Sequence, residues 1–326
     1  MGNKGNSKIF CFDPSGDKKN AHRNRTIYHY TSPDGLLAIL KTPSVRFTDC
    51  QFLNDKSEYT HIHIPLEKAC EEIRDSLFDV NFCDMIENFF QEKYDYVQIF
   101  SEQPGLGFKN LKMYSMRHYV FCASTDPDLL NMWNYYVKGG NYQGYNIGIS
   151  VNDMVKSFTN LIGDKVSLFY GPVVYKDKDK IEILKKEIIE ADTKLHNALK
   201  NVNDGIERDL IVQSYYGETI LHIEHLRLFF KDAAFSGEKE YRFVIRMPEH
   251  RVDINNQLLN TGFTVKQGVI TPHCDVPFSK NGTIKRITIA PMMETGLAKA
   301  GLQRYLRDNE YTNEVEIGFS EIPIRY

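Results

Sequence analysis

The sequence predicts a single α+β domain, spanning residues 26–326, that carries helical insertions. Runs of aromatic and β-branched residues, as at 26–31 and 241–246, are typical of strands and occur towards both ends of the chain. Two long segments, near 62–118 and 178–229, instead repeat apolar residues at helical spacing. Strands at both ends with helices inserted between them are typical of the α+β class.

The N-terminal part of the chain is a polar segment followed by short elements. Residues 1–25 are rich in Asn, Lys, Gly and Ser, and we expect them to form a flexible tail. After the strand at 26–31, Ser32 and Pro33 predict the start of a short helix, as its N-cap and its first helical residue. A second short strand is predicted at 45–48.

Both insertions show the apolar stripes of amphipathic helices. In the first, two helices are predicted from Leu66, Cys70, Ile73, Leu77, Met85, Ile86, Phe89 and Phe90. In the second, one stripe runs through Leu184, Ile188, Ala191, Leu195, Leu199 and Val202. It is interrupted at Asn203-Asp-Gly205 and then resumes, which predicts a long helical hairpin.

The other elements follow from the same two periodicities. Strands are predicted at 119–124, 145–151, 263–268, 284–290 and 315–324, and helices at 129–136 and 294–306.

Composition favours an ordinary globular protein. Hydrophobic residues make up 42% and charged residues 25% of the 326 residues, and the formal net charge of −3 excludes a general attraction to nucleic acid or anionic membrane. The six cysteines form no Cys-x-x-Cys pair and are expected to be reduced thiols. We find no apolar run long enough to span a membrane and no signal sequence, so we expect a cytoplasmic protein.

Two glutamates introduce the late strand at 241–246. Glu238 and Glu240 flank Lys239, so on an extended chain their side chains project to the same side. Two carboxylates held close together repel, and one of them then has a raised pKa suited to acid–base catalysis. The alternative is a solvated charged turn that leads into a strand.

Motifs for metal or nucleotide binding are weaker than the pair of glutamates. His61 and His63 would share one face of a strand, and His29, Asp55 or Glu58 could add ligands, but no second close-spaced ligand group completes a metal site. The sequence contains neither a P-loop nor Gly-x-Gly-x-x-Gly. We therefore expect no metal cofactor, and a metal-dependent nuclease remains a distant alternative.

Several short motifs resemble the DUF2971 family of uncharacterised bacterial proteins, over residues 26–325. They are Tyr28-His-Tyr-Thr-Ser32, Arg46-Phe-Thr48, Leu53-Asn-Asp55, Phe121-Cys-Ala-Ser124, Met132-Trp133, Glu238-Lys-Glu-Tyr-Arg242, Ile287-Thr-Ile-Ala-Pro291 and Ser320-Glu-Ile-Pro-Ile-Arg325. Proteins of this kind often look like components of bacterial antiviral or toxin systems.

More distantly, the motifs resemble the ADP-ribosyltransferase fold, whose core is a split β-sheet. That resemblance implies a first-strand His29 that holds NAD, Ser124 on a middle strand, and Glu238 and Glu240 at the start of a later strand. Glu238 and Glu240 are similar to the transferase version with two glutamates, whereas His29 is similar to the polymerase and diphtheria-toxin version. Taken singly, His29 could be a half-buried strand residue, and Ser124-Thr125 a helix cap.

The resemblance also implies roles in catalysis. Cleavage of the bond between nicotinamide and ribose builds positive charge on the sugar, as in glycoside hydrolysis. Glu240 would stabilise that charge through the ribose 2′-hydroxyl, Glu238 would orient or deprotonate the acceptor, and Ser124 would brace the carboxylate or the ribose.

Further residues are expected to bind the substrates. His29 and Thr31 would contact the adenosine ribose, and Tyr30 or Tyr136 would stack on nicotinamide. Arg46 would meet the pyrophosphate, because a guanidinium can donate two parallel hydrogen bonds to it. The loop residues Asn54 and Asp55 would line the acceptor side.

The expected function is therefore NAD-dependent ADP-ribosyl transfer by a toxin-like effector of bacterial antiphage defence. NAD is the expected co-substrate, the acceptor is expected to be RNA or DNA and otherwise protein, and an antitoxin protein is an expected partner. The alternatives are a glycohydrolase that consumes NAD and a non-catalytic ligand-sensing or interaction module.

Overall fold

The computed structural model describes residues 9–14, 24–53, 55, 60–91, 97–98, 114–137, 143–159, 166–248, 260–266, 268–291, 295–311 and 315–323. The chain divides into two compact units. Unit 1 consists of Met1–Phe52, Met116–Pro172 and Ser236–Tyr326, and unit 2 of Leu53–Ser115 and Val173–Phe235. The two segments of unit 2 correspond to the two helical insertions that the sequence predicts.

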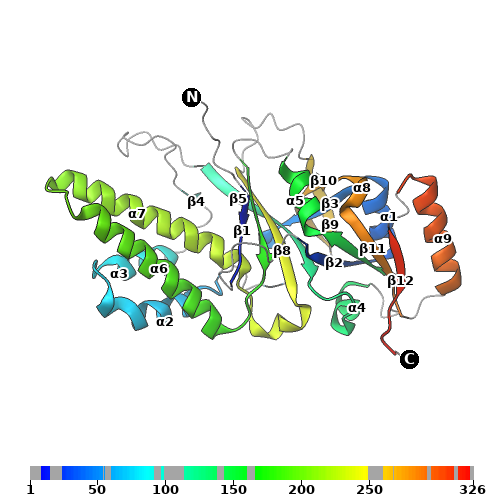
Figure 1. The fold of residues 1–326 in the computed structure, drawn as a ribbon, viewed down its shortest axis with the longest axis horizontal. Coiled ribbons are helices and arrows are strands. Elements are labelled where there is room, and N and C mark those ends of the chain that lie inside the picture. Colours follow the sequence, from blue (N-terminus) through cyan, green and yellow to red (C-terminus); the bar gives the residue numbers. More distant parts are fainter. Residues whose placement is uncertain are drawn as a thin grey trace. The chain divides into compact units, whose positions relative to one another are not determined.

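Unit 1 is built on a mixed sheet, shown in Figure 1. Its strands are β1 (Ile9–Cys11), β2 (Thr26–Thr31), β3 (Ser44–Asp49), β5 (Tyr114–Ser124, which begins in unit 2), β6 (Tyr145–Ser150), β7 (Ser167–Pro172), β8 (Glu240–Pro248), β9 (Asn260–Lys266), β10 (Val269–Pro277), β11 (Ile284–Ile289) and β12 (Glu316–Phe319). The main path runs β1-β7-β8-β5-β2-β6-β11-β12. Among these strands, β1 pairs parallel with β7 and β11 with β12, and the other pairs are antiparallel.

The sheet forks at β5. One edge of β5 pairs with β8 from Met116 to Ser124. The other edge is shared by two strands: β3 pairs where Thr48 lies opposite Val120, and β2 pairs where Tyr28 lies opposite Ser124. One branch continues through β6, β11 and β12, and the other through β10 and β9. Two separate strand systems therefore diverge from the strand that carries Ser124.

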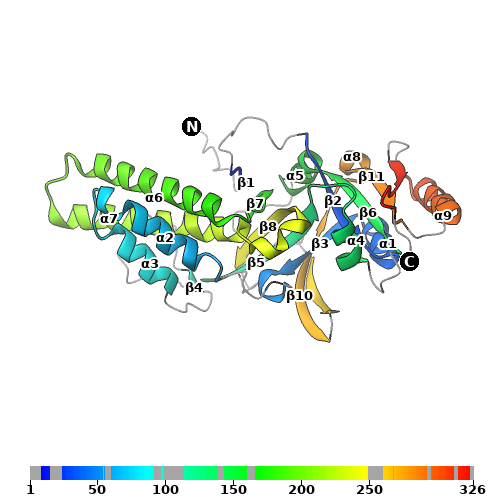
Figure 2. The ribbon, with the colours of Figure 1, turned by 90° about the horizontal axis from the view of Figure 1, so that it is seen from below.

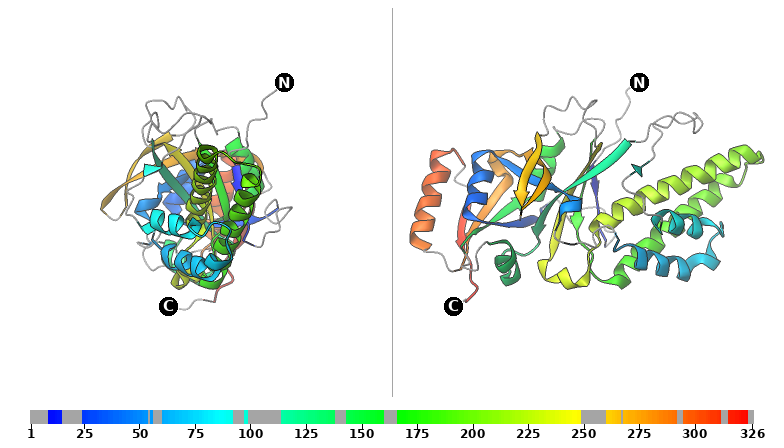
Figure 3. Two further views of the ribbon diagram at one scale, coloured as in Figure 1. Left: turned by 90° about the vertical axis from the view of Figure 1, so that its left-hand side faces the viewer. Right: turned by 180° about the vertical axis from the view of Figure 1, so that it is seen from behind.

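One face of this sheet forms the main hydrophobic core. Apolar residues at alternate positions of β2, β3, β5 and β8 supply it, including Ile27, Phe47, Phe121, Tyr241 and Phe243. The helices of unit 1 are α1 (Pro33–Lys41), α4 (Leu130–Tyr136), α5 (Val151–Thr159), α8 (Lys280–Thr283) and α9 (Thr295–Asp308). Figure 3 shows α9 beside β11 and β12. Together these elements confirm the predicted α+β class.

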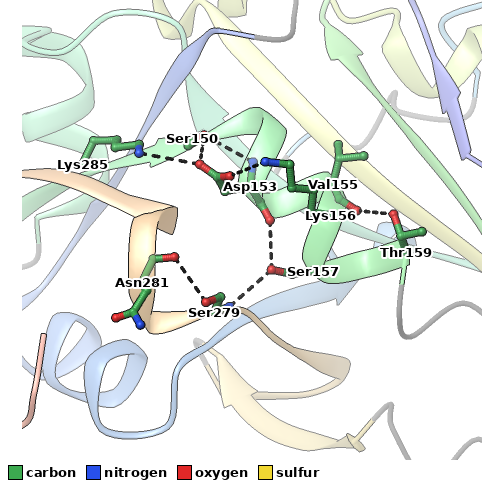
Figure 4. Close-up of polar contacts among 9 residues, drawn as sticks. All are labelled: Ser150, Asp153, Val155, Lys156, Ser157, Thr159, Ser279, Asn281 and Lys285. Carbon is green, nitrogen blue, oxygen red and sulfur yellow. Dashed lines mark hydrogen bonds and ion pairs between the residues drawn. The ribbon is translucent and has the colours of Figure 1, made fainter. Parts of the chain in front are cut away.

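Side chains cap the short helices of unit 1. Ser32 Oγ accepts a hydrogen bond from Gly35 N at 3.1 Å and Pro33 begins α1, which confirms the predicted helix start. At α5, Ser150 Oγ accepts from Asp153 N at 3.3 Å and donates to Asp153 Oδ2 at 2.8 Å, as Figure 4 shows. Partial burial acts to raise the pKa of Asp153, but the hydrogen bond from Ser150 and the ammonium of Lys156 hold it below its usual value.

Unit 2 is helical. Its elements are α2 (His63–Ile73), η2 (Arg74–Ser76), α3 (Phe82–Gln91), β4 (Val97–Gln98), α6 (Asp177–Leu199), α7 (Gly205–Leu226) and η4 (Arg227–Phe229). Helices α6 and α7 run side by side, and α2 packs against α6 (Figure 2). Asp204 caps α7 by accepting from Glu207 N at 2.8 Å. The predicted helical hairpin with its break at 203–205 is confirmed.

Some local predictions are wrong. Ile9–Cys11 lies within the predicted flexible tail but forms β1, where Phe10 stacks on Phe169 with ring centroids 5.0 Å apart. Helix α5 and strands β7 and β10 were not predicted from the sequence, and Pro172, Pro272 and Pro277 within the two strands weaken their strand signal. Among the described residues, no helix is long and apolar enough to cross a membrane.

Candidate functional site

The face of the sheet opposite the main core carries polar side chains. In antiparallel strands, directly opposed residues point to the same side and neighbours along a strand point to opposite sides. The ladders therefore define a polar face that contains Tyr28, Tyr30, Arg46, Thr48, His118, Cys122, Ser124, Glu240, Arg242, Arg246, His273 and Asp275. Many of these groups are buried, so their charges and hydrogen bonds must be matched within the structure.

Glu240 begins β8 on this polar face. It lies opposite Ser124, which in turn lies opposite Tyr28, so three adjacent strands bring these residues into one row. Arg242 donates from Nε to Glu240 Oε1 at 2.6 Å and from Nη2 to Oε2 at 3.1 Å. Both partners are almost fully buried, at 3% exposed for Glu240 and 1% for Arg242. A bidentate guanidinium of this kind favours the ionised carboxylate.

Glu238 does not share the strand with Glu240. It ends the 3-10 helix η5 (Ala233–Glu238), and Lys239 between the two glutamates has a φ of 46°, in the left-handed region. Thr125 holds this turn, since its N and Oγ1 donate to the Lys239 carbonyl oxygen at 2.8 and 3.2 Å. Left-handed backbone at a non-glycine residue often accompanies a functional site.

The two glutamates have different partners. Tyr136 of α4 donates its hydroxyl to Glu238 Oε1 at 3.4 Å, and Glu238 is 3% exposed. Lys239 Nζ instead pairs with Asp126 Oδ2 at 2.8 Å. The predicted repulsion between neighbouring carboxylates is therefore offset for Glu240 by Arg242, a partner that sequence analysis missed. Arg242 was detectable, because residues two apart on a strand share a face.

The side chain of Tyr30 is fixed by ring packing and hydrogen bonds within the protein. Its ring packs edge-on against Trp133 at a centroid distance of 4.8 Å, and it is 2% exposed. Its hydroxyl donates to Asp126 O at 3.1 Å and accepts from Leu129 N at 2.9 Å. A ring held in this way is not presented for stacking on nicotinamide, so of the two predicted aromatic residues the geometry leaves Tyr136.

His29 and Thr31 lie on the opposite face of β2, which corrects the prediction that they share one site with Glu240. Because Tyr28 pairs with Ser124, His29 points to the core side, where its ring lies 4.8 Å from that of Phe121. His29 Nδ1 lies 3.0 Å from Cys122 O, between the two ladders of the fork. Burial lowers the pKa of His29 although this hydrogen bond opposes the shift, so the ring is neutral at pH 7 and donates to the carbonyl.

Arg46 lies on the polar face, as Glu240 does, but in the other branch of the fork. Its Nε and Nη2 donate to Asp275 at 2.8 and 3.1 Å, and its side chain is 49% exposed. His273 Nε2 is 3.5 Å from the same carboxylate. A guanidinium has five N–H donors, so Arg46 keeps donors for a further anion.

Of the two predicted acceptor residues, the structure describes one. Asn54 lies outside the described residues. Asp55 is buried in unit 2, at 7% exposed.

The paired histidines are not on a strand. His61 lies in a turn, and His63 begins α2 because this segment of unit 2 is helical. His61 Nε2 is 2.5 Å from Lys180 Nζ, which also donates to Asp177 Oδ1 at 3.0 Å. Within the residues that the structure describes, no three His, Cys, Asp or Glu side chains are grouped to hold a metal ion.

A comparison with protein families matches part of the chain. A family model described as "Protein of unknown function (DUF2971)" matches residues 132–243, which confirms the resemblance to this family. The matched segment begins in α4 and ends in β8, so it includes Tyr136, Glu238 and Glu240. Neither the curated proteins nor the solved structures gave a match.

Proposed function

We propose that this chain, whose residues 132–243 match the DUF2971 family model, is an NAD-dependent ADP-ribosyltransferase. The observation that carries the proposal is the row formed by Glu240, Ser124 and Tyr28 at the fork of the sheet, with Glu238 beside it. A forked sheet is compatible with the split β-sheet that the resemblance predicts for an ADP-ribosyltransferase. The polar face beside this row supplies further charged groups.

Glu240 would stabilise the charge that develops on the sugar. When the bond between nicotinamide and ribose breaks, nicotinamide leaves with the bonding electrons and the ribose becomes oxocarbenium-like. Arg242 holds both oxygens of Glu240 and so orients the carboxylate towards the position proposed for the ribose 2′-hydroxyl. Arg242 is thus a positioning residue in this mechanism.

Glu238 would accept the proton of the acceptor. As the acceptor oxygen or nitrogen bonds to the ribose carbon, it loses a proton, and a carboxylate next to the sugar can take it. Tyr136 donates to Glu238 and comes from the adjacent helix α4, so it lies where a ring could also contact nicotinamide. Ser124 Oγ accepts a hydrogen bond from Asp126 N, which stabilises the turn beside both glutamates.

Arg46, the residue predicted to bind the pyrophosphate, lies on the polar face. Its pairing with Asp275 fixes the direction of the guanidinium, and its exposed donors can meet phosphate oxygens. His29 and Thr31 lie on the other face, so the proposal no longer assigns them to NAD at the Glu240 site.

The acceptor and the biological role rest on the family resemblance. We propose RNA or DNA as the acceptor, with protein as the second choice, and a toxin-like role in bacterial defence restrained by an antitoxin. A net charge of −3 gives no general attraction to nucleic acid, so such an acceptor would need a local basic surface.

The test uses NAD labelled on its adenylate half, incubated with purified protein and cell lysate. Label should enter one of the RNA, DNA or protein fractions with wild type, and Glu240→Gln should lower incorporation at least about 100-fold. Glu321→Gln, an exposed glutamate of unit 1, is the matched control and should retain activity. Intact NAD with wild-type protein would refute the proposal, whereas free ADP-ribose without a labelled acceptor would show a glycohydrolase.

The burial of both glutamates favours a second candidate, a non-catalytic ligand-sensing module. Glu238 and Glu240 are each 3% exposed, and both oxygens of Glu240 are bonded to Arg242. This arrangement also suits a carboxylate whose role is to hold the fork together. Binding of NAD without turnover, unchanged in Glu240→Gln, would establish this candidate.

A further inference from the structure

Two cysteines of unit 2 lie against each other in the interior. Cys70 is in the last turn of α2 and Cys83 is in the first turn of α3. Both are free thiols with 0% exposure. Cys83 Sγ is 4.0 Å from the backbone oxygen of Cys70, and the two thiols are close enough to hydrogen-bond to each other.

The helices hold the pair in place. Helix α2 ends at Ile73 and α3 begins at Phe82, so the chain between them is short and the two helices pack together (Figure 2). Ile73 and Phe82 are themselves buried, at 4% and 0% exposed. The two thiols are hydrogen-bond partners, so side-chain rotation can bring the sulfurs to the S–S bond length of about 2 Å without a change of fold.

The surroundings make the two thiols chemically different. The hydrogen bond between them lowers the pKa of Cys83; burial opposes this shift, and the positive charge of Arg74 adds to it. The same hydrogen bond, followed by burial, raises the pKa of Cys70. Arg74 is held beside α3 by Asp84 and by Glu87, the latter at 2.6 Å. Cys83 is therefore the better nucleophile of the pair.

We propose that Cys70 and Cys83 form a redox-modification site that a peroxide converts to a disulfide. The Cys83 thiolate attacks one peroxide oxygen, the O–O bond breaks, and the products are a sulfenic acid and, after protonation, one water. The Cys70 sulfur then attacks the Cys83 sulfur, the S–S bond forms, and the hydroxyl leaves as a second water. Two thiols are oxidised while one hydrogen peroxide is reduced to two waters.

The disulfide would connect α2 to α3 covalently. A cross-link across the turn at 74–81 restricts the unfolded chain more than the folded one, so it stabilises unit 2. Because both thiols are buried, peroxide reaches them through local opening of these helices, and the reaction is slower than at exposed Cys11.

The test begins with the wild-type protein and hydrogen peroxide. After treatment, the protein is unfolded, alkylated, digested without reductant and analysed by mass spectrometry. We expect a cross-linked peptide that joins Cys70 to Cys83, lighter by two hydrogens than the sum of its parts and released by dithiothreitol. The proposal is overturned if both thiols remain alkylatable once Cys11 is oxidised, or if either is oxidised further without a cross-link.

A second measurement checks the consequence. The thermal midpoint of the oxidised wild type should exceed that of the reduced form and return when dithiothreitol is added. Cys83→Ser should abolish this shift, whereas Cys274→Ser, which changes a buried cysteine of unit 1, should retain it. A shift that persists in Cys83→Ser would contradict the site.

Discussion

Asp128 joins three segments of unit 1 through one carboxylate. Its Oδ1 accepts from Trp133 Nε1 and from Ser320 Oγ, both at 2.7 Å, and its Oδ2 accepts from Glu321 N at 2.8 Å. The turn that follows Ser124 is thereby fixed to α4 and to the segment after β12. The glutamates of the candidate site depend on this turn, because Thr125 holds the left-handed Lys239 between them.

Replacement of this carboxylate should be costly. In Asp128→Asn, an amide NH₂ takes the place of one carboxylate oxygen. Because an NH₂ group cannot accept a hydrogen bond, the donor opposite it is left without its acceptor. We expect a loss of about 2 kcal/mol in the free energy of unfolding, measured by urea denaturation. Asp209→Asn, an exposed residue of α7, is the control and should change stability by less than about 0.5 kcal/mol. Equal effects of the two substitutions would contradict this role.

At the scale of the elements, one close approach joins β2, α4 and β6. Gly144 precedes β6, and a Cβ at this position would lie 2.6 Å from Thr31 O and 2.9 Å from both methyl groups of Val137. A backbone oxygen cannot move aside as a flexible side chain can. The absence of a side chain at Gly144 therefore allows β6 to enter the sheet next to β2.

Two glycine substitutions should have opposite effects. Gly144→Ala should destabilise the protein by about 1–3 kcal/mol, because the added methyl forces the three elements apart. Gly217→Ala lies inside α7, where a Cβ meets nothing within 4 Å, so it should stabilise by about 1 kcal/mol through helix propensity. Calorimetric or urea unfolding measures both, and a stabilising Gly144→Ala would show that the approach is looser than the structure indicates.

At the scale of the whole molecule, histidines set the response to acid. Burial is the first cause that lowers the pKa of His29, His61, His63 and His273, and the positive charge of Lys180 lowers that of His61 further. The hydrogen bond to Glu187 instead raises the pKa of His222. Four described histidines thus resist protonation in the folded state, and one favours it.

The sign of the pH dependence follows. An unfolded histidine has a pKa of about 6.5, so below that pH the unfolded chain binds protons more readily than the four folded-state histidines whose pKa is lowered. Stability should be highest above about pH 6.5 and fall as the pH drops towards the lower folded-state values. His222 opposes this trend, since its contribution is present below about pH 6.5 and is lost as the pH rises through its raised pKa.

Thermal midpoints between about pH 7.5 and about pH 5.5 test this expectation. His222→Gln should make the loss on acidification steeper, because it removes the opposing group. His61→Gln should make it shallower, because it removes a ring whose protonation would face Lys180 at 2.5 Å. A thermal midpoint that rises as the pH falls would contradict the expected net effect of these histidines.

Local elements were predictable from the sequence where local forces set them. The helical hairpin follows from a stripe with helical period, and its break at Asp204 follows from capping chemistry. Ser32 and Pro33 begin α1 for the same reason. The alternation of Tyr241, Phe243 and Ile245 likewise predicted the core face of β8.

Only the tertiary structure decided which of these local elements share a face. The pairing of Tyr28 with Ser124 joins residues far apart in the chain, and a slip of one residue would move every side chain of β2 to the other side of the sheet. That register places Ser124 and Glu240 on the polar face and His29 on the core face. The contact between Cys70 and Cys83 likewise depends on side-chain packing, which sequence periodicity does not specify.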